Sequence, residues 1–238
     1  YMLKAKNIAL GTPETGWAQA LRPILFPVIA APFFFLGLGE IPLRFLFVIL
    51  SVIGIVFTYL TGTILFNKRT GVVAAFIMSI FYIDIFYTTR LLVDIPQIFF
   101  VNMALFLFVK HAFAGGSKKL IWAILPIIAI GTQMRFTVAL FAIILFLFLI
   151  TTQGLKLFKK KEWYISALMA FALFVPYMIY SWIKLGNPLY AIIQGLTTSN
   201  ASRGEGVTAF SIFMQYINYF PSYLHWIFFA MFLIGLGI

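Results

Sequence analysis

Cysteine is absent from the 238-residue sequence, which excludes disulfide bonds and thiol chemistry. Charge is scarce as well. Asp, Glu, Lys and Arg make up 10% of the chain, against about 25% in soluble globular proteins. Only 6 residues are acidic, whereas 17 are Lys or Arg. So few charges cannot cover a protein of this size in water, and the mean hydropathy of +1.05 indicates that lipid is the solvent.

Motifs that bind nucleotides or activate a serine are also missing. The sequence has no GxxxxGK[ST] phosphate-binding loop, no Gly-rich dinucleotide fingerprint and no GxSxG elbow. We therefore expect no nucleotide cofactor and no nucleotide-driven transport. His111 and His225 have no partner at metal-ligand spacing, so a histidine metal pair is not predicted.

The net charge of +11 has two interpretations. In a soluble protein it would favour nucleic-acid binding. In a membrane protein, Lys and Arg commonly anchor the cytoplasmic loops. The composition favours the second interpretation, so we expect no nucleic-acid partner.

Long apolar stretches dominate the rest of the sequence. A helix crosses a hydrocarbon core of about 30 Å with about 20 residues. Seven stretches reach or approach this length: 43–66, 70–89, 93–113, 118–134, 136–152, 162–185 and 221–238. The predicted fold is all-α, a polytopic transmembrane helical bundle of about seven spans. Because the sequence begins at Tyr1 without Met and ends inside an apolar run at Ile238, we expect it to be truncated at both ends.

An eighth apolar stretch, 23–39, is short and contains Pro23, Pro27 and Pro32. The alternation of loops does not exclude that it spans, but proline disfavours a regular spanning helix. We therefore predict an external helix, interfacial or re-entrant. The predicted domains are an external first loop, 1–42, with juxtamembrane and interfacial helices, and a transmembrane helical domain, 43–238.

Lysine-rich clusters alternate with loops that carry few charges. With residues 1–42 on one side, the opposite side receives nine of the 17 basic residues and a single acid, Glu162. Its basic residues are Lys68, Arg69, Lys110, Lys118, Lys119, Lys156, Lys159, Lys160 and Lys161. The positive-inside rule makes this side cytoplasmic. We therefore predict a multi-pass protein of the cell membrane whose active site faces the outside.

Ionisable residues of the outer side are the candidates for chemistry, because a charge near hydrocarbon needs a partner, water or a charged ligand. Arg90 and Asp94 lie four residues apart and would share one face if the helix continued. Asp94 could cap the helix that contains Pro96. It could instead bind a divalent metal or accept a hydrogen bond from substrate, and one Asp can serve both purposes.

Three further residues have two interpretations each. Arg135 can reach to the outer interface as a snorkelling side chain, or it can bind a phosphate. Arg22 has the same alternatives. Asp84 can pair with Arg90 or line a cavity, and the sequence does not decide between them.

The order of these features resembles that of the GT-C glycosyltransferases, in the branch with protein O-mannosyltransferases and lipid A aminoarabinose transferases. That family has a first external motif with an amphipathic helix, then a basic-Pro step, an apolar interfacial helix, a Gly, and an Arg that opens the second span. After two spans it has an Arg or Tyr and then an Asp, and later a Thr-Lys or Thr-Arg step between short helices. The matching residues are, in chain order, Tyr1 to Ala9, Arg22-Pro23, Gly37, Arg44, Arg90, Asp94, Met134-Arg135 and Gly186-Asn187-Pro188. The stretch Phe81-Tyr82-Ile83-Asp84 departs from the family pattern, so nothing is carried over there.

The resemblance implies a transferase that moves a sugar, with inversion, from a polyprenyl-phosphate donor to an acceptor hydroxyl at the outer face. The acceptor would be a protein, a lipid or a glycan. The family uses an acid of the first loop as general base, and a divalent metal can assist. The acid pair of that loop would precede Tyr1, so we expect the sequence as given to be catalytically incomplete.

The resemblance also implies roles for individual residues. Fixed cations should lie beside the phosphate leaving group, and Arg22, Arg135 and Tyr1 are predicted to bind the lipid phosphate. Asp94 and Arg90 are the predicted catalytic residues. Asp94 would hold the metal or the acceptor, and Arg90 would orient Asp94.

Two other functional classes remain open. A transporter or flippase for a lipid-linked or small substrate would need an ionisable pathway near mid-membrane, whereas these charges cluster at one face. A membrane scaffold without enzymatic activity is the third class.

Overall fold

The computed structural model describes residues 1–12, 23–154, 159–190, 193 and 214. Contacts divide the chain into two units, residues 1–192 and 193–238, and every element described below belongs to the first. All regular structure in the described ranges is helical, which confirms the all-α prediction. The predicted span 221–238 lies outside these ranges.

Four helical segments are long and apolar enough to cross a membrane. They are α4 (Ile41–Leu65), α7 (Asp94–Phe113), α10 (Lys161–Leu185), and the segment Phe136–Gln153, in which a short 3₁₀ turn, η1 (Phe136–Val138), leads into α9 (Ala139–Gln153). Their boundaries lie within a few residues of the predicted spans. The helix α8 (Lys119–Met134) has only 16 residues. A polytopic helical membrane fold is therefore supported, but the full number of seven spans is not confirmed.

The predicted span 70–89 is not one helix. The structure has α5 (Lys68–Ile80) followed by α6 (Tyr82–Thr89), and the chain is extended at Phe81, with φ −67° and ψ 113°. Neither part has the length to cross a membrane by itself. The extended residue separates the two axes and lets α6 pack independently on α4.

The N-terminal region forms two short helices, α1 (Met2–Leu10) and α3 (Leu25–Phe35). Eleven residues of α3 extend only about 16 Å at 1.5 Å per residue, so this helix is too short to cross the hydrocarbon. This length agrees with the prediction that 23–39 does not span.

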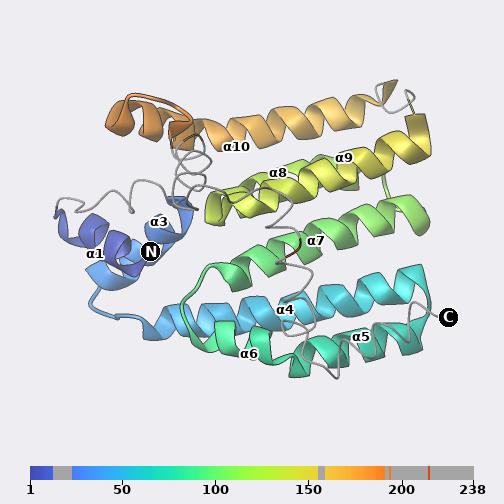
Figure 1. Cartoon of the computed structure of the whole chain (residues 1–238), viewed down its shortest axis with the longest axis horizontal. Coiled ribbons are helices and arrows are strands. Elements are labelled where there is room, and N and C mark those ends of the chain that lie inside the picture. The colour runs from blue at the N-terminus through green and yellow to red at the C-terminus, as the bar shows by residue number, and fades with distance from the viewer. Residues whose placement is uncertain (13–22, 155–158, 191–192, 194–213, 215–238) are drawn as a thin grey trace. The chain divides into compact units, whose positions relative to one another are not determined.

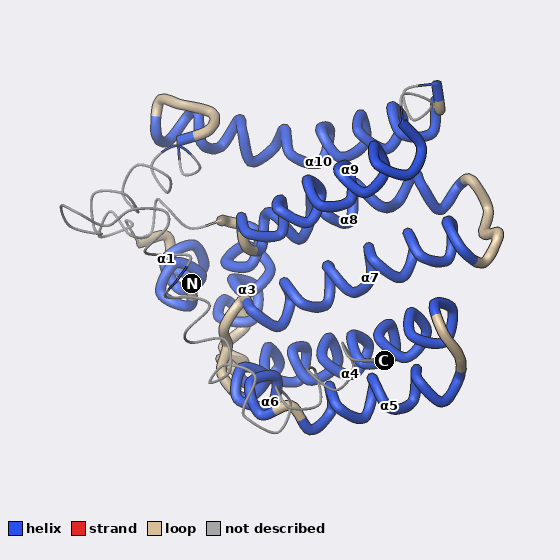
Figure 2. Tube along the Cα trace, turned by 45° about the vertical axis from the view of Figure 1, so that its right-hand side comes forward, coloured by secondary structure: helices blue, strands red, loops and turns tan. Residues whose placement is uncertain are grey.

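The long helices of this unit lie side by side and alternate in direction (Figure 1). The ends of α4, α7 and α9 and the starts of α5, α8 and α10 lie at one end of the helices. We call this end the basic end, and its basic residues are Lys68, Arg69, Lys110, Lys118, Lys119 and Lys159–Lys161. The starts of α4 and α7, the ends of α6 and α8, and helices α1 and α3 lie at the opposite end in both views (Figure 2). We call this opposite end the Asp94 end. The two predicted sets of charges thus separate to opposite ends of the helices.

Polar contacts between helices fix the packing. Pro126 has no N–H, so the carbonyl of Trp122 loses its donor within α8. The hydroxyl of Ser166 on α10 donates to this carbonyl at 3.3 Å and accepts from the N–H of Leu125 at 3.2 Å. Ser166 is fully buried and joins α10 to α8 in the turn of α8 that precedes Pro126.

Candidate active site at the Asp94 end

A shared apolar cluster underlies the Asp94 end. Its buried members come from five helices or their adjoining turns: Ala5, Phe26, Ala30, Leu43, Phe47, Val93, Ile95 and Met134. Phe26 and Phe47 are in ring contact, with centroids 5.4 Å apart. Because Val93, Ile95 and Met134 flank the polar residues Asp94 and Arg135 in sequence, burial of these apolar neighbours places the two charges beside each other.

Asp94 and Arg135 form an ion pair, in which Nη1 of Arg135 donates to Oδ1 of Asp94. Asp94 is the first residue of α7, and Arg135 follows the last residue of α8 in extended conformation. The side chains are 24% and 39% exposed, respectively, so the pair is half-buried at the surface. Among the described residues, no group donates to Oδ2 of Asp94. One carboxylate oxygen is therefore open to a ligand.

A second polar contact joins the same two segments. The hydroxyl of Thr137 in η1 donates to Oε1 of Gln97 on α7 at 3.2 Å. Gln97 follows Asp94 by three residues and shares its helix face, and Thr137 follows Arg135 by two. Neither Gln97 nor Thr137 was predicted from the sequence to belong to the site. The spacing Asp-x-x-Gln was the available signal.

The helix-cap interpretation of Asp94 does not describe this geometry. The residue before α7 is Val93, and no side chain caps the helix. The carboxylate in the first turn still benefits from the positive end of the helix dipole. The carboxylate therefore lies beside two sources of positive charge, the N-terminus of α7 and Arg135.

The expected side-by-side arrangement of Arg90 and Asp94 on one helix face is wrong. Helix α6 ends at Thr89, and Arg90 is extended, with φ −108° and ψ 134°. The guanidinium of Arg90 stacks on the ring of Phe86, 4.1 Å from its centroid. Arg90 is exposed and has no carboxylate partner in the described part of the chain. It is a cation held at the surface by an aromatic ring and open to an anion.

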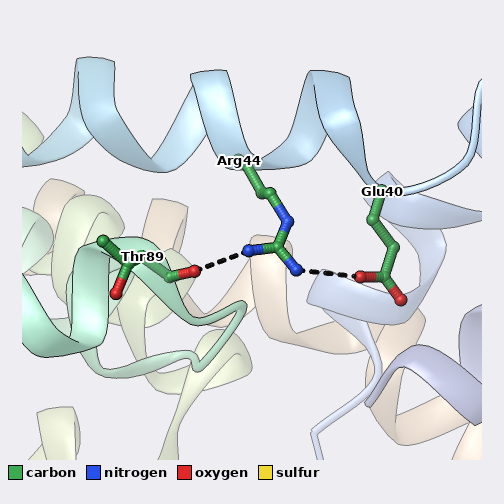
Figure 3. Close-up of polar contacts among 3 residues, drawn as sticks. All are labelled: Glu40, Arg44 and Thr89. Atoms are coloured by element: carbon green, nitrogen blue, oxygen red, sulfur yellow. Dashed lines mark hydrogen bonds and ion pairs between the residues drawn. The ribbon is translucent and has the colours of Figure 1, made fainter.

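Arg44 holds the turn that carries Arg90 (Figure 3). Its Nη1 donates to the carbonyl of Thr89 at 2.7 Å, and its Nη2 contacts Oε2 of Glu40 at 3.3 Å. The Thr89 carbonyl is at the C-terminus of α6, where carbonyls have no partner within the helix. Arg44 therefore anchors the end of α6 to the start of α4.

Asp84 faces α4 and does not pair with Arg90. It is 5% exposed, and the hydroxyl of Ser51 donates to its Oδ2 at 2.7 Å. Its Oδ1 is buried and has no partner among the described residues. Ser51 and Arg44 lie seven residues apart on α4, so they share a face and hold α6 at two points.

The N-terminal candidates are described in part. The ring of Tyr1 packs edge-on against Phe26 of α3, with centroids 6.0 Å apart. Lys4 on α1 is 3% exposed and lies over the ring of Tyr180 on α10, 5.6 Å from its centroid. Arg22 and Glu14 lie outside the described residues. Lys4 was not predicted from the sequence, because an amphipathic helix is expected to expose its lysines to water.

A metal ion does not fit the described side chains. No group of three or more His, Cys, Asp or Glu within the described ranges could hold one. Oδ1 of Asp94 is bound to Arg135, and the carboxylate of Glu40, at the start of α4, is paired with Arg44. We therefore derive no step through a metal, and the predicted metal role of Asp94 stays a prediction.

The sequence was compared with models of protein families, with curated proteins and with solved structures, and it matches a family model. The model of the family described as dolichyl-phosphate-mannose-protein mannosyltransferase matches residues 21–180. This range covers about two thirds of the 238-residue chain and includes Arg44, Arg90, Asp94 and Arg135. No match was found among curated proteins or among solved structures.

Proposed function

Because the chain belongs to the dolichyl-phosphate-mannose-protein mannosyltransferase family, we propose that it transfers a sugar from a polyprenyl-phosphate donor to an acceptor hydroxyl. The family assignment and the four membrane-length helices identify it as an integral membrane glycosyltransferase of the GT-C type. One observation carries the rest of the proposal: turns that are far apart in sequence bring Arg44, Arg90, Asp94 and Arg135 to a single end of the helices.

The chemistry of the reaction matches this set of charges. When the glycosidic bond to the donor breaks, negative charge grows on the departing lipid phosphate. Fixed cations beside that phosphate lower the barrier because they need no reorganisation during the reaction. Arg90 has the exposure and the free guanidinium edge for this task, and the predicted role of Arg22 is the same.

We propose roles for Arg90 and Arg135 that differ from those predicted from the sequence. Arg135 holds Asp94, so it orients the carboxylate, and Arg90 is the cation that binds phosphate. An arginine has five N–H donors, so Arg135 retains donors beyond the one bound to Asp94. The open Oδ2 of Asp94 would accept a hydrogen bond from a hydroxyl of the sugar or the acceptor.

The charge separation also supports an orientation. Lys and Arg collect on the cytoplasmic side of membrane proteins, so the basic end would face the cytoplasm. The Asp94 end would then face the outside of the cell membrane, where a donor lipid and an acceptor protein, lipid or glycan would meet. The apolar helix surfaces would hold the polyprenyl tail.

The test is sugar transfer by the intact protein with a radiolabelled polyprenyl-phosphate mannose donor and a hydroxyl acceptor. Arg90→Gln should raise KM for the donor by about tenfold or more, since a charge-assisted hydrogen bond contributes about 1.5–3 kcal/mol. The control is Arg69→Gln, which removes an exposed arginine from the basic end. A donor KM that is equal in both variants would reject the phosphate role of Arg90.

The product of the assay distinguishes a transferase from a flippase. A transferase makes a covalent bond between labelled sugar and acceptor, whereas a flippase moves the lipid-linked sugar unchanged. Lipid translocation without labelled acceptor would reject the proposed reaction.

A further inference from the structure

An apolar cavity of about 200 Å³ lies between α8, α9 and α10. Helix α9 contributes Leu145, Phe146 and Leu149, and α10 contributes Trp163, Tyr164 and Ala167. Phe146 is 45% exposed and Tyr164 is 58% exposed. Because two lining side chains are exposed, the cavity opens on the surface of the helices.

Lysine side chains border one end of this cavity. Lys159, Lys160 and Lys161 lie just before the lining residue Trp163 in sequence, with Glu162 between Lys161 and Trp163. The ammonium of Lys160 donates to Oε1 of Gln153 at 2.8 Å, and Gln153 lies one helical turn beyond the lining residue Leu149. The contact therefore places a cation at the end of the cavity that belongs to the basic end.

The local charge is positive. Lys159 and Lys161 are exposed, and the acid in this segment is Glu162. Lys118 and Lys119 precede and begin α8 at the same end. An anionic group would meet several lysines here, directly beside an apolar opening.

We propose that this crevice binds an anionic glycerophospholipid, with its phosphate at Lys160 and Lys161 and part of one acyl chain between α9 and α10. Lysine clusters at a membrane surface attract anionic lipid headgroups, and the apolar lining suits a hydrocarbon chain. A cavity of about 200 Å³ is below the usual size of a small-molecule site, roughly 300–1,000 Å³. It therefore takes a segment of a chain and not a complete small ligand.

The site is separate from the proposed transfer reaction. The donor phosphate is assigned to Arg90 at the Asp94 end. Lys160 and Lys161, at the start of α10, belong to the basic end, which is the opposite end of the helices (Figure 1). A lipid bound here would bridge α8, α9 and α10. The bound lipid would stabilise these helices, and its binding can be measured without an assay of sugar transfer.

The experiment uses the intact protein purified in a neutral detergent. Binding of phosphatidylglycerol and phosphatidylcholine is measured by native mass spectrometry and by the rise in Tm. The wild-type protein should bind phosphatidylglycerol and gain Tm, and phosphatidylcholine should have much less effect. Lys160→Gln with Lys161→Gln should weaken phosphatidylglycerol binding by roughly 30-fold, from the usual contribution of two lysines at an anionic surface.

A second variant tests the apolar part. Ala167→Leu fills the crevice and should weaken phosphatidylglycerol binding by roughly tenfold, because about two methylene groups of the acyl chain lose their place. Ala172→Leu is its control, since Ala172 is exposed on the same helix and does not line the cavity. Lys68→Gln with Arg69→Gln is the control for charge, because it removes two cations from α5 at the basic end.

Three results would overturn the proposal. The first is equal binding of the two lipids by the wild-type protein. The second is a phosphatidylglycerol effect that survives both the lysine variant and Ala167→Leu. The third combines two results: a lower Tm of Ala167→Leu without added lipid, and no change in the Tm of the wild-type protein on addition of phosphatidylglycerol. Together these would show that a segment of the protein fills the crevice.

Discussion

The ion pair between Asp94 and Arg135 supports a quantitative prediction by double-mutant cycle. Asp94→Asn and Arg135→Gln each remove one charge and leave the other without its partner. Loss of one partner costs about 3–5 kcal/mol in a fully buried pair and about 0–1 kcal/mol in an exposed one. The side chains are 24% and 39% exposed, so we expect each single substitution to lower the free energy of unfolding by about 1–3 kcal/mol.

The double variant should lose less than the sum of the single variants. It removes both charges, so neither is left half-buried and unpaired, and the coupling energy should be about 1 kcal/mol or more. The measurement is unfolding of the intact protein in mixed micelles, with all four proteins compared under the same conditions.

A second pair provides a matched control. Glu40 and Arg44 are 40% and 52% exposed and lie four residues apart at the start of α4. An exposed pair at this spacing should couple by only about 0.3–0.5 kcal/mol. If the Asp94–Arg135 coupling is no larger than this, the pair is not half-buried as the structure places it.

Turnover gives an independent result from the same proteins. If Asp94 accepts a hydrogen bond from a substrate hydroxyl in the transition state, Asp94→Asn should lower kcat by roughly 10- to 100-fold, since a hydrogen bond to a charged group contributes about 1.5–3 kcal/mol. A structural role alone would change the free energy of unfolding and leave the kcat of the folded fraction intact. If both single variants retain the wild-type kcat, neither Asp94 nor Arg135 belongs to the active site.

Three further predictions follow from other contacts. Arg44→Ala removes the donor to the Thr89 carbonyl and should raise the donor KM while costing about 1 kcal/mol of stability; steady-state kinetics and thermal unfolding measure the two effects, and an unchanged KM would contradict the anchoring role. Ser166→Ala should lower the free energy of unfolding by about 1 kcal/mol, because it leaves the Trp122 carbonyl of α8 without a hydrogen-bond donor; an unchanged Tm would show that this carbonyl finds another donor. Single cysteines at Ser117 and Thr137, introduced into this cysteine-free sequence, should react with an impermeant thiol reagent from opposite sides of the membrane, and labelling of both from one side would refute the alternation of the helices.

Helix positions were predictable because they depend on long apolar runs. The predicted spans 43–66 and 93–113 differ from α4 and α7 by at most two residues at either end. The break at Phe81 was not predictable, because neither proline nor glycine marks it. Burial of Asp84 against Ser51 favours the separation of α6 from α5, and such a contact depends on the packing of two helices.

The candidate site shows where sequence spacing stops being informative. The rule that residues four apart share a face requires a continuous helix, and the chain leaves the helix at Arg90. The true partner of Asp94 is 41 residues away. Alternation of the spans predicted that Asp94 and Arg135 lie at the same end, but the pairing itself depends on the packing of α7 against α8.

The position of Arg90 follows from contacts made by its neighbours. Ser51 and Arg44 hold α6 against α4 at Asp84 and at Thr89. Because the Thr89 carbonyl is bound to Arg44, the helix ends there, and Arg90 begins a short turn that leads to Asp94. Phe86 then supports the guanidinium from within α6. A continuous helix through Arg90 would place Arg90 beside Asp94 and join the two charges to each other. The early end of α6 keeps them apart, so Asp94 pairs with Arg135 and Arg90 remains available to a phosphate.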